Sequence, residues 1–558
     1  MIRRNGGNQM QLTVGTYGCG ALLGVIMGSL GWHLVTDQPS RATVDQVVNS
    51  RLAQHTVDHE HLTSSSRAAS EDARSDDDFE PLFVEWEKPD VAILLTGRQH
   101  GYIEPCGCSG LDQAKGGLIR RHALINDLEG RGWSVLKLDL GDQIQRSGPQ
   151  ALIKLESTYE ALTKVMKYDV VGLGAGELRI DSFEYLRLLM DWGKSPEESP
   201  FVSANASVYE DPNILAYRVV EKNGRRIGIT SVVSQRHFAG QGDLTAPDRD
   251  TKILAPEVAL AKVLPKLSAE KCDAMILLAF VSERESQELA QKFPQFDFIV
   301  NEGVEGEPVG HLQPIQVGNR TVNLVQMGYK SMFAGVIGIY ADPQKPVRYQ
   351  KITLDHRFQD TPEMKDSFKR YQDALERQGL MELIPKPSPH PSGYQYVGSK
   401  VCADCHDAEY DVWAEGTDAW KAEHPGKVGP HSRATLDLVE PGERTWVKRH
   451  HDPECLSCHV TGWNPQQYFA YESGFLDMQK HTELHGSGCE NCHGPGSRHV
   501  ALENGEAAMP GEKDLVLSRL RVTKEESKDR LCVICHDLDN SPNFDFEKYW
   551  PYIEHGSN

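Results

Sequence analysis

Four copies of one cysteine and histidine motif lie near the C-terminal end of the chain. In each copy, two residues separate the cysteines and a histidine directly follows the second. The copies are Cys402/Cys405/His406, Cys455/Cys458/His459, Cys489/Cys492/His493 and Cys532/Cys535/His536. Two thiols at this spacing lie on one side of a helical turn, where they can add to the two vinyl groups of one porphyrin. The pattern therefore predicts four covalently attached c-type haems, with the four histidines as proximal iron ligands.

Zinc is the other metal that paired Cys-x-x-Cys units bind. A zinc ribbon does not require a histidine directly after the second cysteine, whereas all four copies have one. Eight of the twelve cysteines belong to the motifs, which leaves Cys19, Cys106, Cys108 and Cys272. This distribution favours haem attachment over a zinc site or a disulfide scaffold.

The composition limits the partners and the number of domains. With 558 residues, of which 39% are hydrophobic and 25% charged, the chain should hold more than one globular domain. Its formal net charge of −21 would repel nucleic-acid phosphates. We expect no nucleic acid, and favour redox partner proteins or small molecules as ligands.

Residues near the N-terminus predict a membrane segment. Arg3 and Arg4 precede Leu12–Val35, a stretch without Asp, Glu, Lys or Arg that exceeds the roughly 20 residues needed to cross a bilayer core. With the basic end inside, the rest of the chain lies on the periplasmic face of a bacterial inner membrane. We expect a single-pass anchor, and cleavage with release into the periplasm is the alternative.

Apolar periodicity organises the middle of the chain. From Val91 to Asp355, short apolar runs alternate with amphipathic stretches in β-α-β-α-β order, which predicts an α/β layered fold. Strands are expected at 91–95, 134–140, 170–173, 201–204, 274–280, 296–300, 322–327 and 336–340, and helices at 118–128, 151–166, 256–267 and 361–380. A hairpin over 217–233 should turn at Asn223-Gly224.

The sequence thus divides into five predicted parts. They are a membrane anchor or signal segment at 1–36, a disordered acidic linker at 37–89, an α/β domain at 90–356, a helix and Pro-rich linker at 357–393, and a haem domain at 394–558. The last part is expected to be mainly helical and loop-rich, and too polar to build a core from its own side chains. Four porphyrins would supply that core, so the apo-protein should not fold here.

Several motifs in the α/β part resemble the metallophosphatase domain of the 5′-nucleotidase family. They are Leu95–Gly101, Gly116–Arg121, Leu140–Asp142, Gly172–Glu177 and Ser203–Asn205. The resemblance implies an enzyme fold in which two bridged divalent cations convert a water into a nucleophile.

Most metal positions that this resemblance implies carry other residues here. The replaced positions are Arg98 (Asp in the family), Ala175 (Asn), Gly176 (the catalytic His), and Phe280, Gly303 and Glu305 (His). Only His100 and Asp142 are retained. A guanidinium in place of a bridging carboxylate puts positive charge where two dications should bind. We therefore expect a non-catalytic domain that holds no divalent metal.

A pair of cysteines falls in the loop that approaches this degenerate site. Cys106-Gly107-Cys108 could hold a softer metal ion together with His100, Asp142 and Glu177. Alternatively, Cys272 could pair with one of the thiols, or the cysteines could be local loop residues. Spacing alone does not choose among these alternatives.

The C-terminal part resembles the tetrahaem cytochrome c-554 family of electron carriers over nearly its whole length. Besides the four motifs, the matching pieces are Val397–Ser399, Tyr410-x-x-Trp413, His431–Ala434, Pro453–Gly462, Cys489–Gly496 and Phe544–Pro551 with His555. The resemblance implies that His431, His499 and His555 are distal iron ligands, which leaves one iron five-coordinate. A longer segment at 416–430 leaves His424 as an alternative to His431.

These observations predict a membrane-tethered, extracytoplasmic tetrahaem cytochrome that transfers electrons between redox partners. One alternative is a metal-dependent phosphoesterase or 5′-nucleotidase with haem-linked control. Another is redox catalysis on a small nitrogen compound at a five-coordinate haem.

Overall fold

The computed structural model places most of the chain after residue 80. It describes residues 81–105, 114–193, 195–342, 344–440, 446–538, 540–541 and 544–556. Every element below belongs to the unit Pro81–Asn558. The predicted membrane anchor and the Cys106-Gly107-Cys108 pair lie outside the described residues. Within the described part, no helix combines the length and the apolar character needed to cross a membrane.

The first sheet has six strands in the order β14-β13-β1-β2-β3-β4. Its strands are β1 (Val91–Thr96), β2 (Val135–Asp139), β3 (Val170–Gly172), β4 (Phe201–Val202), β13 (Phe333–Ile339) and β14 (Arg348–Thr353). The strands β1 to β4 are parallel neighbours, whereas β13 and β14 add antiparallel strands at the β1 edge. The four parallel strands are buried along their whole length, as expected for a sheet covered on both faces.

The second sheet also has six strands, in the order β11-β12-β10-β9-β7-β6. They are β6 (Arg218–Lys222), β7 (Arg225–Val233), β9 (Ala274–Phe280), β10 (Phe298–Asn301), β11 (Gln313–Val317) and β12 (Arg320–Gln326). The hairpin predicted at Asn223-Gly224 is confirmed: it joins β6 to β7, and both turn residues have positive φ, 49° and 75°. A separate two-stranded sheet pairs β5 (Ala206–Val208) with β8 (Thr251–Ile253).

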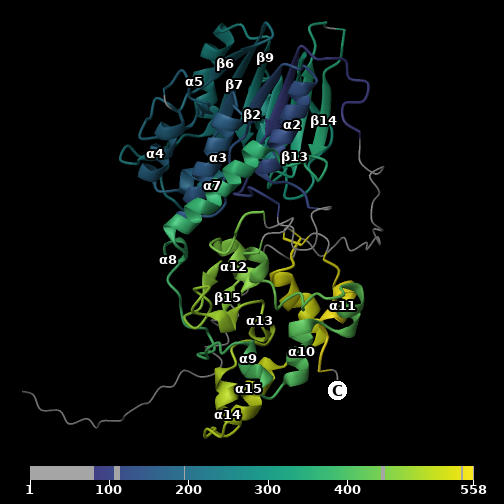
Figure 1. The fold of residues 1–558 in the computed structure, drawn as a ribbon. Helices are drawn as coiled ribbons and strands as arrows, with labels where there is room; N and C mark the ends of the chain where they lie inside the picture. Colours follow the sequence, from purple (N-terminus) through teal and green to yellow (C-terminus); the bar gives the residue numbers. More distant parts are fainter. Residues whose placement is uncertain are drawn as a thin grey trace, which may run out of the picture. The chain divides into compact units, whose positions relative to one another are not determined.

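Helices cover these sheets and complete the predicted α/β layers. They are α2 (Leu118–Gly130), α3 (Pro149–Glu160, continued by a π-helical turn at Ala161–Val165), α4 (Ser182–Gly193), α5 (Pro256–Ala269) and α6 (Glu283–Lys292), with single turns at Glu177–Arg179 and Gln235–Phe238. Beyond them, α7 (Pro362–Gln378) packs along α3 and α2, and α8 (Leu380–Leu383) follows it (Figure 1). The α/β layered fold class is thereby confirmed.

Two stretches that the sequence assigned to linkers pack against this core. Phe83 is only 5% exposed, and its ring lies 4.9 Å from that of Trp133. In α7, Phe368 and Tyr371 are buried. Both stretches are polar overall, and a few aromatic residues make their contacts with the core. The composition of these segments therefore did not predict their packing.

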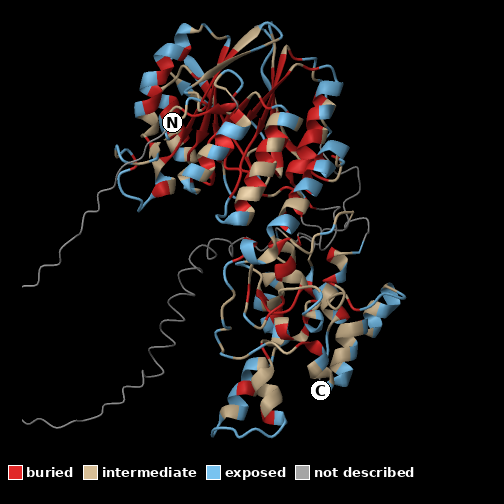
Figure 2. Cartoon of the chain, turned by 60° about the vertical axis from the view of Figure 1, so that its left-hand side comes forward, coloured by how far each residue is buried: buried red, intermediate tan, exposed pale blue. Residues whose placement is uncertain are grey.

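The C-terminal part is built from short helices and loops, as predicted. The helices are α9 (Ser399–Ala403), α10 (Asp407–Glu415), α11 (Asp418–Glu423), α12 (Pro453–His459), α13 (Cys489–His493), α14 (Ser497–Glu503), α15 (Glu512–Leu520), α16 (Lys524–Glu526) and α17 (Phe546–Tyr549). Single turns lie at Leu436–Leu438, Thr482–Leu484, Ser527–Leu531, Cys532–Ile534 and Trp550–Tyr552, and β15 (Trp463–Asn464) pairs with β16 (Phe469–Ala470). Figure 2 shows buried residues concentrated along the two large sheets and sparse in these short helices. Such a segment needs a core from another source, which is what haem attachment would provide.

Candidate haem sites and the pocket of the α/β domain

Each attachment motif forms one helical turn. The amide of His406 donates to the carbonyl of Cys402 at 2.9 Å, and the amide of His536 donates to that of Cys532 at 2.8 Å. Each of these histidines therefore lies one turn after the first cysteine of its motif. None of the described cysteines forms a disulfide, so the eight thiols are available for thioether bonds.

The second cysteines of the first, third and fourth motifs are at least partly accessible to solvent. The Cys405 side chain is exposed and that of Cys535 is half-buried, and neither thiol is hydrogen-bonded to a described residue. A thioether would join each thiol to the porphyrin and not to another side chain, so the protein contacts of these two thiols do not test the assignment. Their assignment to haem attachment stays a prediction from the motif.

Three of the proximal histidines face a second histidine from a distant part of the chain. The pairs, with the separation of their ring centres, are His406 and His499 (6.4 Å), His493 and His555 (6.0 Å), and His536 and His431 (6.3 Å). An iron between two imidazoles, with metal to nitrogen bonds of about 2 Å and ring centres about 1 Å further out, would separate the centres by about 6 Å. The three pairs fit an iron bound between their rings.

Hydrogen bonds orient several of these rings. In each case Nδ1 faces a backbone carbonyl, and because a carbonyl only accepts, Nδ1 must carry the proton. The contacts are His459 with Ala434 (2.6 Å), His493 with Leu520 (2.6 Å) and His555 with Ile553 (2.7 Å). The lone pair then resides on Nε2, which is the nitrogen that binds the metal when Nδ1 donates to a carbonyl.

His459, from the second motif, differs from the other proximal histidines. Among the described residues, no second imidazole faces it at a comparable distance. Burial lowers the pKa of His459 and of the nearby His431, which keeps both rings in the neutral form that binds metals. The histidine of the second motif is therefore the one that no second imidazole faces among the described residues.

His424, the alternative to His431, and two further histidines of the haem domain are engaged elsewhere. The ring of His424 stacks on Trp420 with centres 3.7 Å apart and faces no proximal histidine. The Nδ1 atom of His481 accepts from the Leu476 amide at 3.1 Å, and Nε2 of His485 lies 3.0 Å from the Met478 carbonyl. Packing thus places His431, rather than its alternative His424, opposite a proximal histidine.

Asp452 anchors the second attachment helix and was not singled out from the sequence. It caps α12, and its buried carboxylate accepts from Gln150 of α3 at 2.8 Å and from Gln372 and Tyr371 of α7 at 3.0 and 3.2 Å. The sequence did contain a signal for the start of this helix, namely Asp452-Pro453-Glu454. An Asp N-cap followed by proline at the first helical position is typical of a helix start.

Ion pairs extend the same contact around α12. Lys154 of α3 lies 2.6 Å from Glu454, and Arg449 pairs with the buried Glu104. The guanidinium of Arg449 also lies over the ring of Phe368, 4.8 Å from its centre. Residues of the α/β layers therefore hold the helix that carries Cys455 and Cys458.

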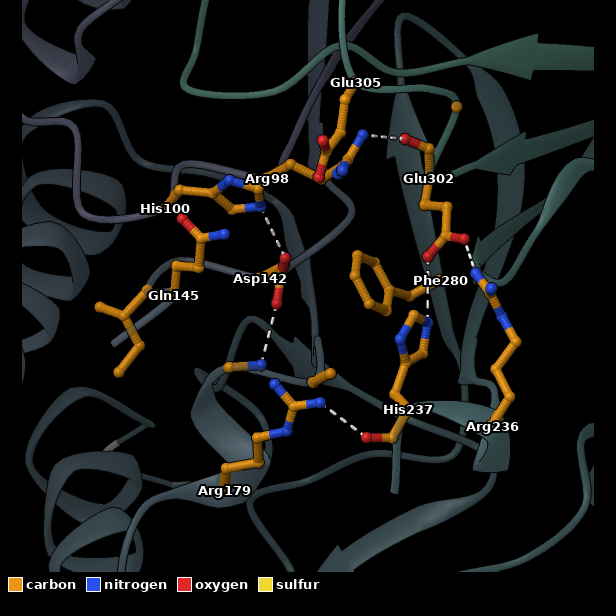
Figure 3. A pocket seen from close by; sticks show the side chains of 14 residues that line it. Arg98, His100, Asp142, Gln145, Arg179, Arg236, His237, Phe280, Glu302 and Glu305 are labelled. Atoms are coloured by element: carbon orange, nitrogen blue, oxygen red, sulfur yellow. Dashed lines mark hydrogen bonds and ion pairs between the residues drawn. The ribbon is translucent and has the colours of Figure 1, made fainter. Parts of the chain in front are cut away.

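The positions that resemble metallophosphatase ligands converge on one cavity of about 320 Å³ in the α/β domain (Figure 3). They follow the carboxyl ends of parallel strands from both sheets, where ligands bind in open α/β folds. The lining residues are Arg98, His100, Asp142, Ile144, Gln145, Ala175, Gly176, Arg179, Arg236, His237, Phe280, Glu302, Gly303 and Glu305.

The two retained ligand positions bond to each other. His100 Nε2 lies 2.8 Å from Asp142 Oδ2, and the Gly176 amide donates to Asp142 Oδ1 at 2.8 Å. Burial alone would raise the pKa of Asp142, but these hydrogen bonds and the charge of Arg98 hold it below its ordinary value. Arg98, His100 and Asp142 all have positive φ, 49°, 54° and 65°, a strained geometry that proteins retain mainly at functional sites.

A dinuclear metal centre does not fit this cavity. The Arg98 guanidinium occupies it and donates through Nη1 to the carbonyls of Glu302 (2.6 Å) and Val304 (3.1 Å). In the described residues, no group of three or more His, Cys, Asp or Glu side chains is arranged to hold a metal ion. Glu177, one member of the softer-metal set suggested by the sequence, is fully buried outside the cavity lining, and burial together with the charge of Asp142 raises its pKa to about 8.

Residues 401–494 match the family described as cytochrome c554 and c-prime. Cytochrome c-554 of Nitrosomonas europaea is 31% identical over 152 residues, which span 26% of this chain and 60% of that protein. The predicted resemblance to cytochrome c-554 is confirmed. The family match at 401–494 includes the first three attachment motifs. The alignment with the Nitrosomonas europaea protein spans less than two thirds of that protein. The similarity supports haem c as the cofactor, and the number of four haems stays a prediction.

Solved structures of a nucleotidase and a thiohydrolase are similar to this chain at low sequence identity. The 5′-nucleotidase precursor of Thermus thermophilus gives a TM-score of 0.43 at 18% identity, covering 62% of this chain and 66% of its own. The sulfate thiohydrolase SoxB of Thermus thermophilus gives 0.42 at 15% identity, covering 52% and 62%. Neither similarity gives information on activity. The contacts within the cavity are the relevant observations.

Proposed function

We propose that this protein is an extracytoplasmic, membrane-tethered tetrahaem c-type cytochrome that transfers electrons between redox partners. The observation that carries the proposal is the set of three opposed histidine pairs, each formed by a motif histidine and a distant one. Two neutral imidazoles on one iron give an electron carrier, since no coordination position remains for a substrate.

The proposed ligand scheme follows from these pairs. The first haem would have His406 and His499 as axial ligands, the third His493 and His555, and the fourth His536 and His431. The second would have His459 alone. When bound, c-type haem supplies one-electron redox chemistry. The chain contributes the thioether cysteines, the imidazole ligands and the carbonyls that fix the tautomers.

Neighbouring attachment motifs are in contact, which suits a carrier that passes electrons along its length. The side chains of Cys402 and Cys489 are close enough to interact electrostatically, which places the first and third motifs next to each other. His431, the proposed distal ligand of the fourth site, is close enough to His459 of the second site for their charges to interact. The proposed sites thus form at least two close pairs.

A second candidate function rests on His459. An iron without a distal histidine can bind a small molecule, and we infer that redox catalysis on a small nitrogen compound could take place there. A high-spin signal that shifts on adding hydroxylamine or nitric oxide, with turnover of the compound, would support catalysis. Binding without turnover would leave electron transfer as the function.

The direct test of the main proposal is a redox titration of purified holo-protein. We expect four haems per chain that are reduced and reoxidised reversibly without consuming a substrate. A haem content below four, or haems that do not exchange electrons with small redox mediators, would contradict the proposal.

The tether and the location have a separate test. Leu12–Val35 supports a membrane anchor because it lacks charged residues. The full-length protein should fractionate with inner membranes, and a variant with a cleavable leader in place of residues 1–36 should be recovered from the soluble periplasm with its haems. If the gene for the full-length protein instead yields protein in the soluble fraction, the result would argue that the N-terminal segment is cleaved.

A further inference from the structure

We infer that the α/β domain controls the reduction potential of the second haem, through the ion pair that its Glu104 forms with Arg449. The inference rests on the proposed function, because it requires a haem at the second motif. It gives the α/β domain a part in electron transfer that depends on fixed charges and not on the cavity of that domain.

Residues of the α/β domain contact the haem domain around the second motif. Asp452, the N-cap of α12, accepts hydrogen bonds from side chains of α3 and α7. Lys154 of α3 pairs with Glu454 of α12 at 2.6 Å. This helix carries the cysteines and the histidine of the second motif. The α/β domain therefore meets the haem domain at the motif whose histidine, His459, no second imidazole faces among the described residues.

Arg449 belongs to the haem domain, and its side chain contacts residues of the α/β domain. Its Nη1 atom donates to Glu104 Oε2, and the two side chains are only 16% and 12% exposed. The guanidinium also lies over the ring of Phe368, 4.8 Å from the ring centre. The amide of Arg449 donates to the Leu438 carbonyl at 2.8 Å, and its carbonyl accepts from the Asp452 amide at 3.0 Å. Contacts from both domains therefore fix the position of this positive charge.

The same guanidinium is close to the groups that would hold the second haem. Arg449 is near enough to Cys455 for their charges to interact. Burial lowers the pKa of His459, and the charge of Arg449 lowers it further. A ferrous haem carries one positive charge fewer than a ferric haem, so a nearby cation favours reduction and a nearby anion opposes it. Arg449 should therefore raise the reduction potential, and Glu104 should offset part of that rise.

Two other ion pairs near this motif are more exposed to water. Asp437 also interacts with the histidine of the second motif, but it lies 2.6 Å from Arg433 and is 43% exposed. Glu454, which is paired with Lys154, is 33% exposed, against 12% for Glu104. Water screens exposed pairs more strongly than buried ones. The pair of Glu104 with Arg449 should therefore have the largest effect on the potential.

Two further acids lie near Arg449. Asp452 and Asp360 both interact with its charge, and burial raises the pKa of each. Neither acid is changed in the variants below, so neither alters the sign of the expected shifts.

Potentiometric titration of the full-length holo-protein tests this inference. The high-spin electron paramagnetic resonance signal follows the haem of the second motif, and the visible spectrum follows all four haems. Arg449→Gln should lower the midpoint potential of the high-spin haem by about 59 mV, which corresponds to a tenfold change in its reduction equilibrium. Glu104→Gln should raise the same potential, since it removes an anion and leaves the cation.

Further variants separate the effect of charge from that of packing. Arg449→Lys keeps the positive charge and should retain most of the wild-type potential, although the planar fork of the guanidinium is lost. The double variant Glu104→Gln/Arg449→Gln should lie between the two single variants. Arg131→Gln is the control, because this arginine of the α/β domain pairs with Asp127 and is 37% exposed. It should change no potential.

Several outcomes would overturn the inference. They are unchanged potentials in both Arg449→Gln and Glu104→Gln, shifts of the same sign in these two variants, and a shift of the same size in Arg131→Gln. If Arg449→Gln does not assemble with its haems, the rise expected in Glu104→Gln decides the outcome. Absence of a high-spin signal in wild type would instead contradict the proposed ligand scheme. The midpoint potentials from the visible spectrum would then still show whether one haem shifts.

Discussion

His493 and His555 face each other with ring centres 6.0 Å apart, and the Nδ1 atom of each lies close to a backbone carbonyl, of Leu520 and Ile553 respectively. One histidine follows its cysteine pair directly, while the other lies near the C-terminal end of the chain. The carbonyls fix Nδ1 as the protonated nitrogen in both rings and so direct Nε2 to the metal. Segments far apart in sequence thereby bring two imidazoles together, as the proposed ligand scheme of the third haem requires.

The choice between His431 and His424 gives a matched pair of variants. His431→Ala should convert one haem from low-spin to high-spin, because the ring opposite His536 is removed. His424→Ala should leave the spin states unchanged, since that ring stacks on Trp420. Electron paramagnetic resonance of the oxidised proteins measures both. A spin change in His424→Ala alone would reverse the assignment.

Asp452 should be important for the stability of the second haem site. Asp452→Ala leaves the buried donors of Tyr371 and Gln372 without this acceptor and removes one of the two acceptors of Gln150, which we expect to lower the free energy of unfolding by about 2–4 kcal/mol. Urea unfolding of the holo-protein measures the change. Asp411→Ala is the control, because this carboxylate of α10 lies outside the attachment motifs and is exposed. Equal losses in the two variants would contradict a specific role for Asp452.

Glu177 predicts a pH dependence of stability. Its pKa is about 8 in the folded protein, against an ordinary value of 4.5. Folding therefore favours the protonated acid, and the stability that this contributes is fully present below about pH 4.5 and is lost progressively as the pH rises from there through 8. The slope is at most about 1.4 kcal/mol for each pH unit in that window.

Glu177→Gln tests this dependence because glutamine does not ionise. The midpoint of thermal unfolding of wild type should fall relative to that of Glu177→Gln as the pH rises from 6 to 9. Glu184→Gln, which changes a side chain that is 41% exposed, should follow wild type. Parallel curves for wild type and Glu177→Gln would show that Glu177 is not protonated in the folded state.

We expect no divalent-metal-dependent hydrolysis of nucleotides or phosphomonoesters. The Arg98 guanidinium and the Phe280 ring occupy positions that metal ligands would need, and Asp142 is already bonded to His100. Hydrolysis of 5′-AMP and phenyl phosphate with Mn²⁺ should be no faster in wild type than in Asp142→Asn. Metal-dependent activity that Asp142→Asn abolishes would instead support the phosphoesterase alternative.

Local sequence signals predicted much of the fold. The strand expected at 274–280 matches β9 from end to end, because its apolar run begins directly after Asp273 and ends one residue beyond the strand, before Ser282. The Asn223-Gly224 turn was equally predictable, since both residues tolerate positive φ. By contrast, the pairing of β13 with β1 joins strands from opposite ends of the domain, and no local pattern encodes such a partner.

For the candidate sites too, the sequence predicted some features and not others. Cysteine spacing specifies the attachment motifs, because thioether chemistry requires two thiols on one turn. The histidines that face them come from other segments, so their placement depends on tertiary packing; His424 and His431 both lie in a polar stretch that does not distinguish them. The contacts of Asp452 and the ion pair of Arg449 with Glu104 also arise only when distant strands and helices meet.

The central claim is that three irons have two histidine ligands and one has a single histidine. Electron paramagnetic resonance of the oxidised holo-protein, together with a pyridine haemochrome count and carbon monoxide binding to the reduced form, tests it most directly. We predict four haems per chain, three low-spin and one high-spin, with one carbon monoxide bound. Four low-spin haems, more than one high-spin haem, or a chain that carries zinc in place of haem would contradict the account.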